Sequence, residues 1–159
     1  MIIRDETTED HDAVRDLLIA AFGGDGEARL VEALRADGDL PVALVAEEGG
    51  EVAGFIALSS LRAPADALAL APLAVGPGYQ RSGFGSALAA AAMARAQTAG
   101  ASLVFVLGDT GYYQRFGFSV EAAANFECTY AGPHFMALRL SPAAPNTGAV
   151  VYSARFSEL

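Results

Sequence analysis

The stretch Leu68–Gly100 reads LALAPLAVGPGYQRSGFGSALAAAAMARAQTAG, and its three parts decide the fold. The apolar run 68–75 predicts a buried strand, a glycine-broken turn follows it, and the alanine-rich part predicts a long helix over about 83–99. Glycines let the backbone approach an anion, and the free N–H groups and dipole at a helix start favour negative charge. We therefore expect the N–H groups of residues 81–86 to form a phosphate-binding site.

A proline interrupts the apolar run at Pro72, and proline cannot donate a hydrogen bond to a neighbouring strand. An ordinary edge strand would explain this proline. A buried strand that bulges near Pro72 and separates from its neighbour beyond it would explain it equally well. In the second case the backbone groups of Leu73, Ala74 and Val75 are free to bond a ligand.

A second motif, GDTGYYQRFGF at 108–118, follows the apolar segment 103–107. That segment predicts a buried strand parallel to 68–75, so the two strands and the helix between them form a unit whose ligand lies at the carboxyl ends of the strands. Asp109 or Thr110 can cap a short helix after the second strand. The helix carries three aromatic residues, Tyr112, Tyr113 and Phe116.

Both motifs resemble one family. Gln80-x-x-Gly83-x-Gly85 is similar to the acetyl-CoA signature of the GNAT-type N-acetyltransferases, and Tyr113, four residues before Gly117-Phe118, resembles that family's later motif. Over nearly its whole length the chain looks most like a small bacterial subgroup of these acetyltransferases. The resemblance implies one N-acetyltransferase domain over residues 1–159, of the α/β (α+β) class. Its mixed central sheet would contain a splayed parallel strand pair flanked by helices.

The resemblance also implies acetyl-CoA as cofactor, CoA as product and an amine as acceptor. Arg81 would add its charge to the phosphate site. The cofactor-binding residues expected on this basis are Leu73, Ala74, Val75, Gln80, Arg81, Ser82, Gly83, Phe84, Gly85, Ser86, Asp109, Tyr112, Tyr113 and Phe116. The catalytic residues expected are Tyr113, whose phenol would protonate the departing thiolate, and Val75, whose backbone N–H would bind the oxyanion.

The sequence does not assign a general base. Many members of the resembled family carry a glutamate on the central strand, whereas the run 68–75 contains no acidic residue. Glu27, Glu127 and His134 are candidates, and a water chain to a backbone carbonyl is another. The missing glutamate also keeps open an alternative function, a catalytically inactive CoA-binding sensor or interaction module.

Other chemistries find less support in the residues. The turn at 80–86 lacks the Gly-Lys-Ser/Thr that a nucleotide-hydrolysing P-loop needs. Cys128 has no activating neighbour in the sequence, so we expect an inert thiol. His11 and His134 lie far apart without a cluster of cysteine or histidine, so no metal site is expected.

Composition narrows the class further. The 159 residues suit one domain, and the apolar content of 53% is enough for a sizeable core. A net charge of −9 disfavours nucleic-acid partners, and neither a membrane segment nor a secretory signal is recognisable. One cysteine fits a reducing compartment, and we expect a cytoplasmic protein. A homodimer through the C-terminal strands is compatible with the sequence, and the acceptor amine, in a small molecule or a protein, is not encoded in a recognisable motif.

The remaining pattern predicts a helix capped by Thr8, a second helix at 27–36, and a hairpin turn at Glu48-Gly49-Gly50-Glu51. Pro142–Gly148 is expected to be a surface loop. The strands predicted outside the central unit are 2–4, 42–47, 52–61, 118–120, 135–140 and 150–156.

Overall fold

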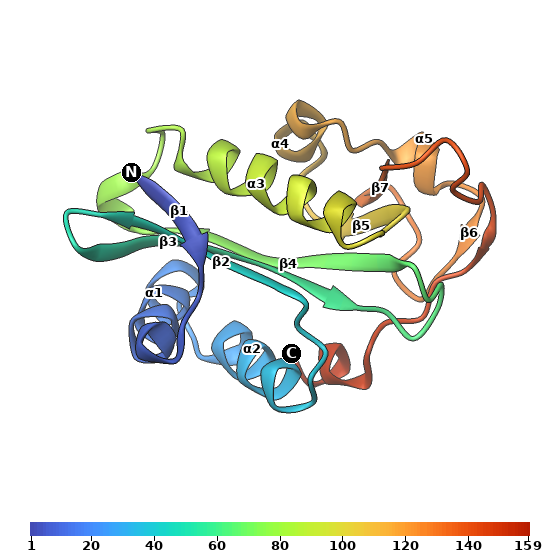
Figure 1. The fold of residues 1–159 in the computed structure, drawn as a ribbon. Helices are drawn as coiled ribbons and strands as arrows, with labels where there is room; N and C mark the ends of the chain where they lie inside the picture. The colour runs from blue at the N-terminus through green and yellow to red at the C-terminus, as the bar shows by residue number, and fades with distance from the viewer.

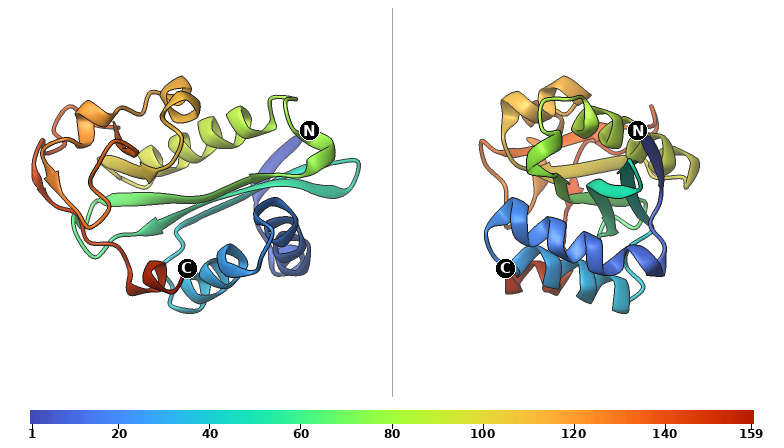
Figure 2. Two further views of the ribbon diagram at one scale, coloured as in Figure 1. Left: turned by 180° about the vertical axis from the view of Figure 1, so that it is seen from behind. Right: turned by 90° about the vertical axis from the view of Figure 1, so that its left-hand side faces the viewer.

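The computed structural model describes residues 1–159 and shows a mixed sheet with helices on both faces (Figures 1 and 2). Six strands follow one another in the sheet in the order β1-β2-β3-β4-β5-β7, and only β4 and β5 are parallel neighbours. Their bounds are β1 Ile2–Asp5, β2 Val42–Glu48, β3 Glu51–Ser60, β4 Ala67–Val75, β5 Leu103–Leu107 and β7 Phe135–Arg139. A separate pair consists of β6 Phe126–Glu127 and β8 Gly148–Ala149.

The helices form a layer on each side of the sheet. The long helix α3, Phe84–Thr98, covers one face, whereas α1, His11–Phe22, and α2, Gly26–Ala36, cover the other (Figure 1). The shorter helices are α4 Thr110–Tyr113, α5 Val120–Ala123 and the 3₁₀ turns Thr8–Asp10, Pro77–Tyr79, Gln114–Phe116 and Ala154–Glu158. None of the helices combines the length and the apolar character needed to cross a bilayer.

Alanine brings α3 close to the sheet. Ala89, Ala92 and Ala96 are fully buried, and small side chains at these positions let the helix backbone approach the strands. The contact is tight enough that a Cβ atom on Gly54 of β3 would lie 2.8 Å from a methyl carbon of Leu88. The start of α3 is thereby fixed against the middle of the sheet.

The strands β4 and β5 separate beyond Leu70. Parallel pairing joins Ala67–Leu70 to Leu103–Val106, and the rest of β4 pairs only with β3. The register between β3 and β4 shifts between Ile56 and Leu58, which is a bulge near the buried Pro72. The interpretation with a bulge and a splayed pair is therefore confirmed, and the edge-strand interpretation is wrong.

The separation frees some of the backbone groups that the sequence singled out. Gly76 donates its N–H to Ala53 of β3 at 2.7 Å, and Val75 pairs with Gly54. Because hydrogen-bonding groups alternate along an antiparallel strand, Ala74 and Gly76 face β3, while the N–H groups of Leu73 and Val75 face the gap left by β5. The expectation that Ala74 is free as well is wrong for this reason.

Most other elements agree with the sequence pattern, and three do not. The hairpin joins Glu48 to Glu51, as expected. Thr7, not Thr8, is the residue that precedes the first helical turn, and its backbone N–H donates a hydrogen bond to the Asp10 carboxylate. The predicted strand 118–120 is one bridge at Ser119 followed by α5. The predicted strand 150–156 is a single bridge at Val151 followed by a 3₁₀ turn.

The two wrong strands share a physical cause. Phe118 and Phe156 are buried, but their segments form short helical turns in place of strands. An apolar residue recurring over a few positions shows that a segment packs on the core, and it does not specify a neighbouring strand.

Candidate active site

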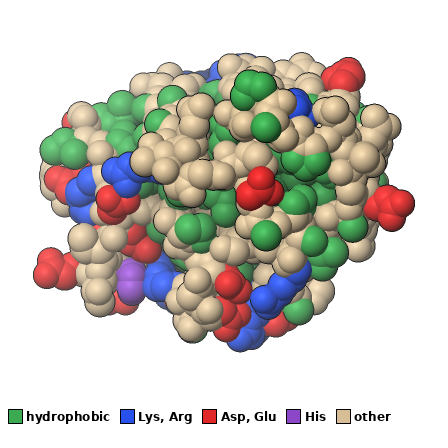
Figure 3. All heavy atoms as spheres, turned by 45° about the vertical axis from the view of Figure 1, so that its right-hand side comes forward, with side chains coloured by type: hydrophobic (Ala, Val, Ile, Leu, Met, Phe, Trp, Pro, Cys, Tyr) green, Lys and Arg blue, Asp and Glu red, His purple; other side chains and the backbone are tan.

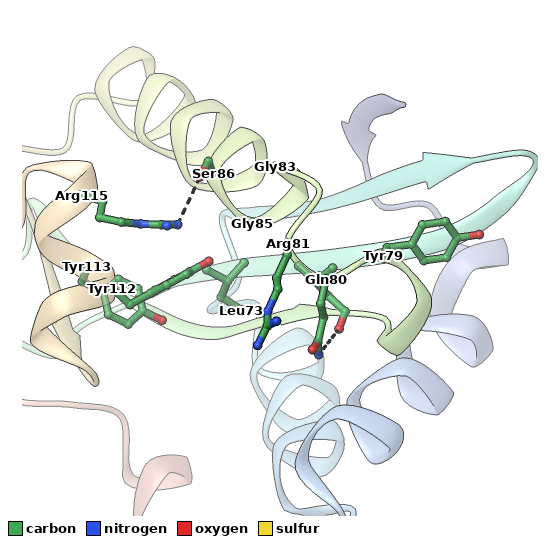
Figure 4. A pocket seen from close by; sticks show the side chains of 11 residues that line it. Leu73, Tyr79, Gln80, Arg81, Gly83, Gly85, Ser86, Tyr112, Tyr113 and Arg115 are labelled. Carbon is green, nitrogen blue, oxygen red and sulfur yellow. Dashed lines mark hydrogen bonds between the residues drawn. The ribbon is translucent and has the colours of Figure 1, made fainter.

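A cleft of about 720 Å³ opens between the start of α3, the free end of β4 and the helix α4 (Figure 4). It is lined by Leu73, Val75, Tyr79, Gln80, Arg81, Gly83, Gly85, Ser86, Tyr112, Tyr113 and Arg115. The cleft therefore brings together the two sequence motifs, which lie on opposite sides of the separated strands.

The turn before α3 has a backbone shape suited to anions. Arg81 has φ +63°, which makes it the one non-glycine residue of the chain with positive φ, and Gly83 follows with φ +84°. Holding a non-glycine residue in this region costs about 1–2 kcal/mol. Successive N–H groups of a turn that contains such residues can form a concave site for an anion. The Gln80 amide donates a hydrogen bond of 3.3 Å to the Val75 carbonyl, which ties the turn to the free end of β4.

Tyr112 closes the space between α4 and α3. A Cβ atom on Gly85 would lie 2.3 Å from the Tyr112 hydroxyl oxygen, so only glycine leaves room for that hydroxyl. The Tyr112 ring packs edge-on against Tyr113 and Phe116, with centroid separations of 5.1 Å in both cases. Burial raises the pKa of Tyr112, while the nearby Arg115 lowers it by a smaller amount.

Tyr113 lies deeper in the site. Its ring occupies the space beside Gly108 at the end of β5, where a Cβ atom would be 2.7 Å from ring carbon Cε2. Phe118 packs edge-on against it with centroids 5.9 Å apart. Burial and, to a smaller extent, the neighbouring Tyr112 together raise the pKa of Tyr113 to about 12. The phenol is therefore a protonated group at neutral pH, which is the state an acid needs.

The comparisons with known proteins agree with these motifs. The family model described as Acetyltransferase (GNAT) family matches residues 11–118. The chain belongs to the GNAT acetyltransferase family. The N-acetyltransferase YhbS of Escherichia coli strain K12 is 35% identical over 165 residues, which cover 99% of each chain.

Solved structures of GNAT proteins have the same fold. The crystal structure of Escherichia coli YhbS in complex with CoA is 32% identical, with a TM-score of 0.90 over 98% of this chain and 91% of that one. A GNAT acetyltransferase of Brucella melitensis in complex with acetyl-CoA is 36% identical, with a TM-score of 0.83 over 98% of this chain and 97% of the other. The expected fold class, a mixed sheet of the GNAT type, is confirmed.

Within this GNAT fold the structure places five of the expected residues outside the lining of the cleft. Ala74 is buried with its backbone toward β3, and Phe84 packs in the core with its ring 5.4 Å from that of Tyr79. Ser82 is exposed and donates to the Gln80 carbonyl. Asp109 caps α4 by accepting from the N–H groups of Gly111 and Tyr112. The Phe116 ring packs edge-on against the Tyr112 ring.

Two lining residues were missed by the sequence reasoning, Tyr79 and Arg115. Arg115 lies three residues after Tyr112, and residues at this spacing share one face of a helical turn. That spacing was the available signal. Tyr79 stacks on Phe84, and an aromatic residue alone in a turn of glycine and proline gives no comparable pattern.

The candidate bases lie outside the lining of the cleft. His134 is exposed, and its backbone carbonyl accepts the Gly108 N–H at 3.0 Å, which places its backbone beside the end of β5. Glu127 is exposed in β6, and Glu27 lies in the first turn of α2. Cys128 is partly buried, and burial raises the pKa of its thiol, which disfavours the reactive thiolate.

Proposed function

We propose that this GNAT protein binds acetyl-CoA in the cleft and transfers the acetyl group directly to a primary amine within a ternary complex. The observation that supports the proposal is the cleft, whose lining contains residues of the turn before α3, the free end of β4 and Tyr113. The relatives crystallised with CoA and acetyl-CoA support the identity of the cofactor.

In the proposed complex each end of the cofactor meets a different part of the cleft. The N–H groups of residues 81–86 and the positive end of the α3 dipole would hold the pyrophosphate. The pantetheine arm would follow the gap between β4 and β5, which the backbone N–H groups of Leu73 and Val75 face. The thioester would then lie near Val75 and Tyr113.

The transfer itself needs three groups around the thioester. The neutral amine attacks the carbonyl carbon, and the negative charge that develops on the oxygen is stabilised by the Val75 N–H, which faces the gap. As the new C–N bond forms and the C–S bond breaks, Tyr113 gives its proton to the sulfur and later regains one from solvent. The proton of the attacking amine leaves to a base, and Glu27, Glu127, His134 and water stay the candidates for that step.

The protein cannot acetylate a lysine side chain of its own, because this sequence contains no lysine. The acceptor amine therefore belongs to another molecule or to a chain terminus. This composition helps the assay, since no lysine side chain of the enzyme can compete for the acetyl group. Primary amines to be tried are spermidine, free lysine and a short peptide with a free α-amino group. Release of the CoA thiol reports the reaction.

Two measurements test the proposal. Calorimetric titration with acetyl-CoA should give micromolar affinity, about 8 kcal/mol, with little binding of ATP. With an accepted amine, Tyr113→Phe should lower kcat by about 10²-fold or more, the range typical of a lost general acid, while the Kd for CoA changes little. Tyr130→Phe removes a partly buried phenol outside the cleft lining and is the control. An unchanged kcat in Tyr113→Phe would remove the phenol from the mechanism.

A further inference from the structure

Some cationic side chains of the protein form ion pairs with carboxylates, and others do not. All 10 are arginines, against 19 acidic residues. Those that form ion pairs with carboxylates are Arg4, Arg15, Arg29, Arg35, Arg95 and Arg155. In the space-filling view most basic side chains lie beside acidic ones (Figure 3). Arg139 bonds instead to loop carbonyls and Asn146.

Of the three arginines left, two line the cleft. Arg81 extends from the turn before α3, and Arg115 from the segment after α4 on the opposite wall (Figure 4). Arg62 is not part of the cleft lining. Neither Arg81 nor Arg115 has a carboxylate partner. In a protein of net charge −9, two unneutralised guanidinium groups in one cleft favour an anionic ligand.

The Arg115 guanidinium is held in place but has spare donors. Its central carbon lies 4.8 Å from the centre of the Tyr112 ring and 5.3 Å from that of Phe116. Its one hydrogen bond is a long contact of 3.4 Å to the neutral hydroxyl of Ser86. A guanidinium carries five N–H donors in a planar fork that matches phosphate oxygens, so most of these donors are available to a ligand.

The contact with Ser86 shows how near Arg115 lies to the expected phosphate site. Ser86 belongs to the first turn of α3, the same turn whose N–H groups line the cleft. The guanidinium therefore faces the positive end of the α3 dipole, where two positive groups without a ligand repel each other. A phosphate between them would remove that repulsion and be bound from both walls.

We propose that Arg115 is a second phosphate-binding side chain for the CoA part of the cofactor, facing the α3 turn across the cleft. That the ligand is CoA rests on the proposed function, whereas the proposal does not depend on how the acetyl group is transferred. On binding, the bond to Ser86 is exchanged for charge-assisted bonds to phosphate. CoA carries both a pyrophosphate and a 3′-phosphate, which share this chemistry, and 3′-dephospho-CoA separates the two.

The test is calorimetric titration with CoA and 3′-dephospho-CoA, which requires no acceptor amine. Arg115→Ala should raise the Kd for CoA about tenfold or more, and tenfold corresponds to about 1.4 kcal/mol. Arg115→Lys should lose part of that affinity, because it keeps the charge without the planar fork. Arg62→Ala removes one exposed, unpaired guanidinium outside the cleft and should leave the Kd within about twofold of the unmodified value.

Each pattern of results is decisive. If Arg115 binds the 3′-phosphate, the unmodified protein binds 3′-dephospho-CoA about as weakly as Arg115→Ala binds CoA. If it binds the pyrophosphate, Arg115→Ala weakens both ligands by the same factor. Both patterns support the proposal, and a Kd for both ligands that Arg115→Ala leaves unchanged overturns it.

Two further readouts keep the test interpretable. Failure of the unmodified protein to bind CoA would overturn the proposed function itself, so the two failures are distinct. Thermal unfolding of each variant reports folding, and Arg115→Gln, which keeps a planar polar side chain without the charge, replaces Arg115→Ala if that variant unfolds. Higher salt should weaken CoA binding less in Arg115→Gln than in the unmodified protein. Equal salt dependence would count against a charge contact.

Discussion

Replacing Gly85 with alanine tests why this motif position has to be glycine. The new methyl carbon would lie 2.3 Å from the Tyr112 hydroxyl oxygen, whereas ordinary contacts begin near 3.4 Å, so the hydroxyl has to move by about 1 Å. The ring cannot move freely because Tyr113 and Phe116 pack against it. Overpacking of this kind costs about 1–3 kcal/mol. Alanine in a helix regains about 1 kcal/mol relative to glycine.

The two contributions can be separated with a second change, Tyr112→Phe. Without the hydroxyl, the nearest ring atom to the new methyl carbon is the one that bore it, at 3.6 Å, which is an ordinary contact. Gly85→Ala should therefore lower the free energy of unfolding by up to about 2 kcal/mol in the unmodified protein. In the Tyr112→Phe background it should raise that free energy by up to about 1 kcal/mol.

The assay is urea or thermal unfolding of the four proteins in this double-mutant cycle. A coupling of about 1–3 kcal/mol corresponds to a difference in Tm of several degrees, at about 2–4 °C per kcal/mol for a protein of this size. If Gly85→Ala changes the stability equally in both backgrounds, the steric reasoning is wrong. A loss of CoA affinity in Gly85→Ala/Tyr112→Phe, with stability restored, would show that the glycine also serves the close approach of phosphate.

Three more outcomes follow from the geometry. Gly108→Ala would place a methyl carbon 2.7 Å from the Tyr113 ring, so kcat should fall toward that of Tyr113→Phe, and a full kcat would refute the need for this ring position. Because burial raises the pKa of Tyr113 to about 12, the phenol should cause no loss of activity below about pH 11. An alkaline loss centred near pH 10 that disappears in Tyr113→Phe would contradict this. Arg4 holds the pKa of Asp10 well below its ordinary 3.8 through hydrogen bonds of 2.7 and 2.9 Å, so this pair stabilises the fold above pH 4 and less as the pH falls further. Unfolding of Asp10→Asn should accordingly show a loss of about 1–3 kcal/mol at pH 7 and a smaller one at pH 2.5, and equal losses would exclude the linkage.

Much of the site was predictable because its motifs are local. The turn at 80–86 combines a strand end, glycines and a helix start within a few residues, and the structure places most of its predicted residues around the cleft. Pro72 restricted the strand to two arrangements, an edge or a bulge, and the structure shows a bulge, with β4 and β5 paired only as far as Leu70. These features depend on backbone conformations that particular residue types favour or forbid, and a sequence reports such preferences directly.

The general base could not be predicted for the opposite reason. A base is defined by its position relative to the acceptor nitrogen, and its candidates come from segments far apart in the chain, at Glu27, Glu127 and His134. Their approach to the thioester depends on how whole elements pack, and no local pattern encodes that distance.

The sequence by itself determined the GNAT-like unit of strand, turn, helix and strand, and it singled out the turn that we propose binds phosphate and the tyrosine that we propose as acid. Only the tertiary structure decided that Val75 and not Ala74 turns its N–H to the gap, that Tyr112 requires a glycine at Gly85, and that Arg115 faces the α3 turn. The physical reason is the different distances along the chain over which the interactions act. Backbone preferences act within a few residues, whereas strand register and contacts between α3 and α4 are set by packing across the whole core.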